Sequence, residues 1–308
     1  MLGISKYFEK KSASKSIVLT VFQVALVAAL LLLQQFQLIE NSFSFYPFMV
    51  FVVLNVGLVY LSDFYLTKIG IIRDTFYYLP LLFTVNTLLY FKNLSLDFII
   101  NQIVFVTILF IIVIRQNQEL IQMHVFHISF LIVAISFFFY QVIFVILPVI
   151  ILILIFSTRP IRNISVYFIS IGMSFFFLYS LLYFFWKIFD YKLMTLLSER
   201  FSGISVQPGF EWYIALMLLF FIVSIFEVIN ALNKANIFRK NFMYMSVILI
   251  AIDIGISIFL SGYVLSYSIP LICYLYGNFI RFRKKAFVKE IFFSGAIVLC
   301  ILLMYLNV

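Results

Sequence analysis

The sequence predicts an all-α fold, a polytopic transmembrane helix bundle formed by a single domain over residues 1–308. The chain is 65% hydrophobic and 11% charged, with a mean hydropathy of +1.18, whereas soluble domains are about 45–50% apolar and about 25% charged. Its apolar runs are continuous and do not alternate, which favours helices over barrel strands. No stretch of mixed polarity is long enough to form an extramembrane domain.

A helix needs about 20 apolar residues to cross the hydrocarbon, and on this criterion the chain holds about eleven spans. The first span follows a basic N-terminal segment and lacks a small-x-small cleavage site, so we interpret it as a retained helix and not as a signal peptide. The predicted spans are 17–38, 46–66, 75–91, 95–114, 121–139, 142–158, 163–186, 212–231, 242–261, 264–280 and 290–307.

The segment 121–158 can form one long helix or two short ones. Tyr140 and Gln141 place polar groups in its middle, and Arg115 and Arg159 lie on either side of it. Because Lys and Arg favour the cytoplasmic face, both arginines are expected on the same side of the membrane. An even number of crossings must then separate them, which favours two helices.

The distribution of Lys and Arg predicts that the N-terminus is cytoplasmic. With this orientation, the outer segments contain four of the 21 basic residues, namely Lys92, Lys187, Lys192 and Arg200. The net charge of +9 is therefore a topology signal, and no nucleic-acid partner is needed to explain it. The expected location is a bacterial inner membrane, and the expected partners are membrane lipids, whose anionic headgroups attract basic segments.

Residues 189–201 have the period of an amphipathic helix and predict one such helix at the outer face. Arg200 falls inside the apolar arc of this helix, where its side chain can snorkel or contact a lipid phosphate. Membrane anchoring explains the helix by itself. A lid over a lipid-side site is the functional alternative.

His124 and His127 are the two histidines of the chain. They lie near the inner interface, about 60° apart on one helix face. A zinc site needs about three or four ligands, and Cys273 and Cys300 both lie inside apolar runs. We therefore predict no metal and no cofactor and interpret the histidines as interfacial, with a metal site or a proton relay as the alternatives.

Asp253 lies near the middle of the predicted span 242–261, close to the bilayer centre. An aspartate at this depth costs about 2.5–3.5 kcal/mol on insertion scales and faces a partner or a cavity. Two interpretations stay open. Asp253 is either an intramembrane substrate or proton site, or a paired structural carboxylate packed near Gly255.

A second group of polar residues is predicted in the outer half of the bundle. Glu40 and Asp97 are the candidate catalytic carboxylates there, while Asn101 and Gln102 are candidate contacts, with Arg200, for a substrate or a lipid phosphate. Ordinary interfacial polarity and helix contacts are the alternative explanation. Asn55, in the middle of its span, is expected to hydrogen-bond between helices.

The chain also resembles a domain-of-unknown-function family of multi-pass inner-membrane proteins of Bacteroidota. The resemblance rests on L-V-Y-L-S-D-F-Y-L-T-K, N-L-S-L-D-F-I-I-N-Q-I-V-F-V-T-I-L-F, H-V-F-H-I-S-F-L-I-V-A-I-S-F-F-F-Y and P-L-I-C-Y-L-Y-G-N-F-I. The chain departs from the family pattern at Arg115, which Gln follows where the family has a second Arg, and at His127, where the family has Asp. Some family members are labelled beta-carotene monooxygenase, a label we reject because two histidines are too few for such an iron site.

These observations predict a membrane protein of the cell envelope and leave three classes of function open. The first is an enzyme that acts on a polyprenyl-linked sugar or another lipid substrate at the outer face, for which the outer polar residues, the amphipathic helix and Arg200 occur together. The second is a transporter or flippase that uses Asp253. The third is a non-catalytic subunit that packs against a membrane protein partner.

Overall fold

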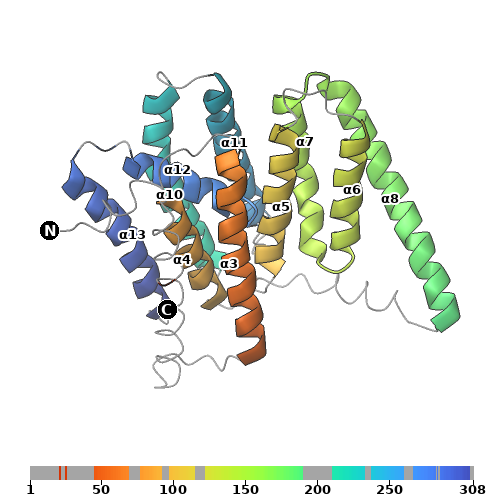
Figure 1. The fold of residues 1–308 in the computed structure, drawn as a ribbon, viewed down its shortest axis with the longest axis horizontal. Coiled ribbons are helices and arrows are strands. Elements are labelled where there is room, and N and C mark those ends of the chain that lie inside the picture. The colour runs from red at the N-terminus through yellow and green to blue at the C-terminus, as the bar shows by residue number, and fades with distance from the viewer. Residues whose placement is uncertain are drawn as a thin grey trace.

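The computed structural model describes residues 45–68, 77–91, 97–114, 122–189, 210–232, 237–259, 266–281, 283 and 285–305, together with Val21 and Ala25. This part of the chain is entirely helical apart from short connections (Figure 1). Its helices are α3 (Phe45–Lys68), α4 (Tyr78–Phe91), α5 (Asp97–Ile114), α6 (Gln122–Ser136), the 3₁₀ helix η1 (Tyr140–Val145), α7 (Ile146–Phe156), α8 (Pro160–Phe189), α10 (Phe210–Leu232), α11 (Ile237–Phe259), α12 (Ile269–Arg281) and α13 (Ala286–Tyr305).

The all-helical fold class is confirmed for the described residues, and a helix is present at each predicted span from 46–66 onward. Among the described residues, three helical segments are long and apolar enough to cross a membrane, namely Phe48–Lys68, Pro160–Phe184 and Lys240–Ile258. The other apolar helices are shorter. The chain is therefore a membrane protein by composition and helix length, as its hydropathy predicts. The predicted first span, 17–38, lies outside the described residues except for Val21 and Ala25.

The segment 121–158 forms two helices, as its polar centre predicts. Helix α6 ends at Ser136, and the backbone N–H groups of Phe138 and Phe139 both donate to the carbonyl oxygen of Ile135. The chain then turns through η1 into α7, whose C-terminal end lies at the same edge of the molecule as the start of α6 (Figure 1). Arg159, which follows α7, is thereby returned to the end of the bundle at which α6 begins.

The predicted outer amphipathic helix at 189–201 lies outside the described residues except for its first position. The preceding helix, α8, is 30 residues long and continues to Phe189, which is three residues beyond the predicted end of its span. It stands at one side of the bundle (Figure 1) and packs against α6 and α7. A row of its large apolar side chains is exposed, including Phe168, Phe176 and Phe184.

Helix α12 is enclosed by other helices along nearly its whole length. Every residue from Ile269 to Ile280 is buried, and the helix packs against α4, α5, α10, α11 and α13. In Figure 1 it runs across the direction of α3 and α10 instead of alongside them. At 13 residues it is about 20 Å long, whereas the hydrocarbon is about 30 Å thick. The predicted span at 264–280 thus coincides with a helix that is shorter than the hydrocarbon is thick, and its crossing of the membrane stays a prediction.

Gly277 allows α12 to approach the start of α4. A Cβ atom at this position would lie 3.2 Å from both the Cβ and the backbone nitrogen of Tyr78. Few Cβ atoms tolerate such contacts, and here one of the neighbouring atoms belongs to the backbone, which cannot rotate away. The absence of a side chain at Gly277 therefore sets the distance between the two helices.

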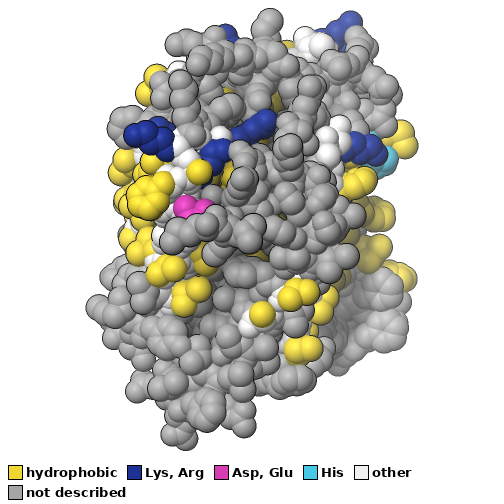
Figure 2. All heavy atoms as spheres, turned by 60° about the vertical axis from the view of Figure 1, so that its left-hand side comes forward, with side chains coloured by type: hydrophobic (Ala, Val, Ile, Leu, Met, Phe, Trp, Pro, Cys, Tyr) yellow, Lys and Arg dark blue, Asp and Glu magenta, His cyan; other side chains and the backbone are white. Residues whose placement is uncertain are grey.

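The described basic side chains lie toward one end of the bundle. Lys68 ends α3, Arg159 and Arg162 lie at the start of α8, and Arg281 ends α12. The Lys and Arg side chains visible in Figure 2 are confined to its upper half, with apolar side chains gathered below them. We call this end of the molecule the basic end.

Replacing Gly277 by Ala is expected to lower the thermal stability of the purified protein. Overpacking of a tight contact costs about 1–3 kcal/mol, and Gly255→Ala is the matched control because a Cβ at Gly255 meets nothing within 4 Å. Melting in detergent should show Gly277→Ala unfolding several degrees below Gly255→Ala. Equal melting temperatures would contradict the close approach of α12 to α4.

Candidate functional site

A pocket of about 330 Å³ opens between α3, α5 and α6. Its polar lining consists of Lys68, His124 and His127, and its apolar lining consists of Ile108, Phe110, Ile111, Ile128 and Leu131. Ile108 and Ile128 are buried, whereas Lys68 and His127 are exposed. The pocket therefore has an apolar floor and a rim that carries nitrogen donors. Its volume lies near the lower end of the range for ligand sites, which is about 300–1,000 Å³.

The pocket exists because α5 and α6 pack against different partners. Helix α5 packs against α3 and α7, whereas α6 packs against α8. Figure 1 shows α5 and α6 separated at the upper edge of the bundle, with the end of α3 nearby. The side chains of Lys68 and the two histidines reach the space between these helices.

Aromatic rings hold the Lys68 ammonium at the pocket. Its Nζ lies 5.3 Å from the centroid of Phe64 and 5.8 Å from the centroid of Phe110, which are cation–π distances. The Phe110 ring is itself fixed by Tyr65, which stacks on it with a centroid separation of 4.0 Å. Lys68 is thus the last residue of a span-length helix, and its cation is directed to the pocket before any ligand binds.

The two histidines occupy the first turn and a half of α6. His127 is exposed, whereas His124 is partly buried. The Nδ1 atom of His124 is buried and has no hydrogen-bond partner within the described part of the chain. Because His124 is the third residue of α6, it lies at the N-terminal end of that helix, where the helix dipole favours a negative charge.

The described residues do not gather a metal-binding set around the histidines. No group of three or more His, Cys, Asp and Glu side chains is close enough to hold a metal ion in this part of the chain. Cys273 and Cys300 are both buried thiols of α12 and α13. The absence of a metal site stays a prediction, and the polar groups that the structure places at the pocket are the Lys68 ammonium and the two imidazoles.

Asp253 lies outside the pocket, at the beginning of α12. Its Oδ2 accepts hydrogen bonds from the backbone N–H of Ser268, at 3.1 Å, and from the Ser268 hydroxyl. Its Oδ1 accepts one from the Ser257 hydroxyl at 3.4 Å. Asp253 is fully buried, and its carboxylate is the partner of the N–H group of Ser268, the residue that directly precedes α12 inside the bundle.

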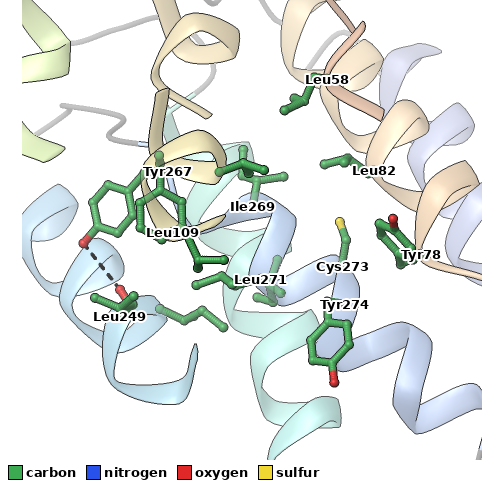
Figure 3. Packing of buried hydrophobic residues seen from close by; sticks show 14 of the residues in the cluster. Leu58, Tyr78, Leu82, Leu109, Leu249, Tyr267, Ile269, Leu271, Cys273 and Tyr274 are labelled. Carbon is green, nitrogen blue, oxygen red and sulfur yellow. Dashed lines mark hydrogen bonds between the residues drawn. The ribbon is translucent and has the colours of Figure 1, made fainter. Parts of the chain in front are cut away.

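The turn that precedes α12 is tied to two neighbouring helices. Ser266 has a positive φ of 59°, and its hydroxyl donates to the carbonyl oxygen of Phe98 in α5 at 3.1 Å. The Tyr267 hydroxyl donates to the carbonyl oxygen of Leu249 in α11 at 3.4 Å (Figure 3). Together with Asp253, these contacts determine where α12 starts. The sequence left two interpretations of Asp253 open, and this geometry matches the one in which Asp253 is a paired structural carboxylate.

A chain of buried amides connects α3, α4 and α5. Gln102 and Asn86 exchange two hydrogen bonds of 3.0 and 3.2 Å, and the Asn86 amide also donates to Asn55 Oδ1 at 3.1 Å. The Asn55 amide donates in turn to the carbonyl oxygen of Phe83 at 3.3 Å. The expectation that Asn55 bonds between helices is confirmed. Gln102 bonds to Asn86, and its predicted contact with a substrate stays a prediction.

The structure brings together few of the residues predicted for an outer site. Asn101 and Gln102 are both fully buried in α5. Asp97 is the first residue of that helix, at the end opposite the basic end (Figure 1), and its side chain is not among those described. Glu40 and Arg200 lie outside the described residues. A catalytic pair of Glu40 and Asp97 therefore stays a prediction.

Sequence reasoning did not connect Lys68 with the histidines, although each residue lies at a predicted inner interface. The available signal was the position of all three near the inner ends of their helices. Sequence periodicity does not show which helices are neighbours, so the three residues could not be placed around one pocket. No family model matches the chain, and neither a curated protein nor a solved structure is significantly similar to it. The resemblance to the Bacteroidota family stays a prediction.

Asp253→Asn is expected to leave folding nearly intact, whereas Asp253→Leu should destabilise the protein strongly. Asn keeps a carbonyl oxygen for Ser268, and the Ser257 hydroxyl can rotate to accept from the new amide. Leu leaves the Ser268 donors buried without a partner, at about 1–3 kcal/mol each. Thermal melting in detergent measures both variants. If Asp253→Asn melts as early as Asp253→Leu, the capping role of the carboxylate is wrong.

Asn86 and Gln102 should show a favourable coupling energy in a double-mutant cycle. Interhelical hydrogen bonds in membrane proteins contribute on average about 0.6 kcal/mol and at most about 1.7 kcal/mol, and this pair makes two. We expect about 1 kcal/mol of coupling between Asn86→Ala and Gln102→Ala, measured as unfolding free energies in mixed micelles. Additive effects of the two substitutions would show that the pair does not interact.

Proposed function

We propose that this protein is a multi-pass inner-membrane protein that binds a lipid substrate, with the lipid headgroup in the pocket lined by Lys68, His124 and His127. The observation that carries the proposal is the composition of this pocket. One cation and two imidazoles stand at the rim, and five apolar side chains form the remainder. Mostly apolar pockets with a few convergent polar groups are typical ligand sites.

The depth of the pocket supports a lipid ligand. Lys68 closes a helix long enough to cross a bilayer, so its ammonium is at the level where hydrocarbon ends and headgroups begin. The other described basic residues lie toward the same end of the bundle (Figure 2). By the preference of Lys and Arg for the cytoplasm, we assign this end to the cytoplasmic face.

The proposal keeps the lipid substrate that the sequence suggests and places its headgroup at the basic end instead of the outer face. The outer-face alternative depends on Glu40, Asp97 and Arg200, whose side chains are not described. Transport through Asp253 has less support, because that carboxylate already accepts three hydrogen bonds.

The proposal is tested by photocrosslinking with dodecyl phosphate that carries a diazirine on its alkyl chain. In phosphatidylcholine nanodiscs, we expect crosslinks on α5 and α6 near the pocket, mapped by mass spectrometry. Lys68→Gln should reduce them several-fold, because a lysine–phosphate hydrogen bond is lost at the pocket. Lys285→Gln is the matched control, since Lys285 is an exposed lysine outside the pocket lining. Crosslinks that are spread evenly over the lipid-facing helices, or that are unaffected by Lys68→Gln, would refute the proposal.

A further inference from the structure

We infer that the pocket selects a headgroup ending in a phosphate monoester, so that its ligand is a lipid monophosphate. This inference rests on the proposed function, because it names the chemical class of the lipid bound at that same site. The observations that carry it are the number, charge and placement of the nitrogen groups around the pocket.

Three side chains with N–H donors converge on one small space from two helices. Lys68 comes from the end of α3, and His124 and His127 come from the start of α6. An ammonium offers three N–H donors, and each imidazole offers at least one. A phosphate monoester presents three terminal oxygens and can accept from all three side chains at once, whereas a carboxylate presents two oxygens.

The charge of the pocket also favours a phosphate over a singly charged group. No acidic side chain is among the described residues that line it. Asp63, on the same helix as Lys68, accepts a hydrogen bond from the Thr67 hydroxyl at 3.3 Å and is not part of the lining. The cation of Lys68 and the positive end of the α6 dipole therefore act together. A phosphate monoester carries about −1.5 to −2 charges at neutral pH and gains most from both.

His124 is one of the side chains that line the pocket. Its Nδ1 is buried, with no partner in the described part of the chain, and is closed off from the pocket, so the other ring nitrogen is the one that can reach a ligand. An imidazole N–H donates to a phosphate oxygen, whereas a quaternary ammonium has no acceptor for it. The nitrogen donors therefore favour an oxyanion over a choline headgroup.

The apolar floor indicates that the phosphate is attached to a hydrocarbon chain. Ile108 and Ile128 are buried at the pocket, and Ile111 and Leu131 are partly buried beside them. Inorganic phosphate would leave the exposed parts of Ile111 and Leu131 uncovered. A chain that fills the floor adds burial worth about 25 cal/mol per Å² of apolar surface. We therefore expect the ester and its first methylene groups to bind together.

The inference is tested by native mass spectrometry of the protein with three probes of one chain length, namely dodecyl phosphate, dodecyl sulfonate and dodecanoate. Sulfonate has three oxygens and one charge, and carboxylate has two oxygens and one charge. We expect dodecyl phosphate to bind at least about tenfold more tightly than either, as one extra charge-assisted hydrogen bond would provide. Lys68→Gln and the double variant His124→Gln/His127→Gln should each remove most of this preference, while Lys285→Gln should retain it.

The possible outcomes separate the inference from the proposed function. Equal binding of the three probes, all reduced by Lys68→Gln, would overturn the phosphate preference and leave the lipid-binding proposal standing. Binding of none of them, with the wild-type protein folded by its melting temperature, would overturn both. Competition by inorganic phosphate at the same concentration as dodecyl phosphate would show that a free anion is the ligand. Variants that lose the preference must melt within a few degrees of the wild type to support the assignment.

Discussion

A helix that begins inside a membrane bundle must find partners for the N–H groups of its first turn, because no water is available to them. Helix α12 is in this position, and Asp253 supplies the partner through Ser268. The remaining architecture follows from this contact. The start of α12 lies beside Asp253, and Gly277 lets the helix approach α4 closely. In this position α12 packs against α4, α5, α10, α11 and α13. A carboxylate that is costly in lipid is tolerated here because it satisfies a helix end that would otherwise be costly as well.

The basic end combines two features that are usually discussed separately. Lys and Arg at the inner ends of helices orient a membrane protein, and they also place positive charge at the depth of lipid phosphates. At Lys68 this positive charge has a defined position, because two aromatic rings hold the ammonium beside a pocket. The histidines of α6 add N–H donors to the pocket, whereas the orientation of the protein in the membrane depends on Lys and Arg. A residue placed for orientation can thereby contribute to a binding site.

Polar residues that appear alike in a hydropathy profile have different roles in this structure. Gln102 and Asn86 satisfy one another across α4 and α5, and Asp253 caps α12, so these residues hold helices together. The imidazoles of His124 and His127 line a pocket, so they can receive a ligand. The distinction between the two roles depends on whether the hydrogen-bonding capacity is already used. It cannot be judged from residue type or depth.

The sequence by itself determined the helical class, the position of the helices and the division of 121–158 into two helices, because each depends on apolar length or on the placement of Lys, Arg and other polar residues along the chain. It also identified Asn55 as an interhelical contact and Asp253 as a residue that needs a partner. Only the tertiary structure decided that α12 is enclosed by other helices, that Ser268 is the partner of Asp253, and that Lys68 meets the histidines of α6. The physical reason is that protein interior and lipid are both apolar. A helix surrounded by helices and a helix surrounded by lipid can therefore have the same composition, and only the packing of neighbours distinguishes them.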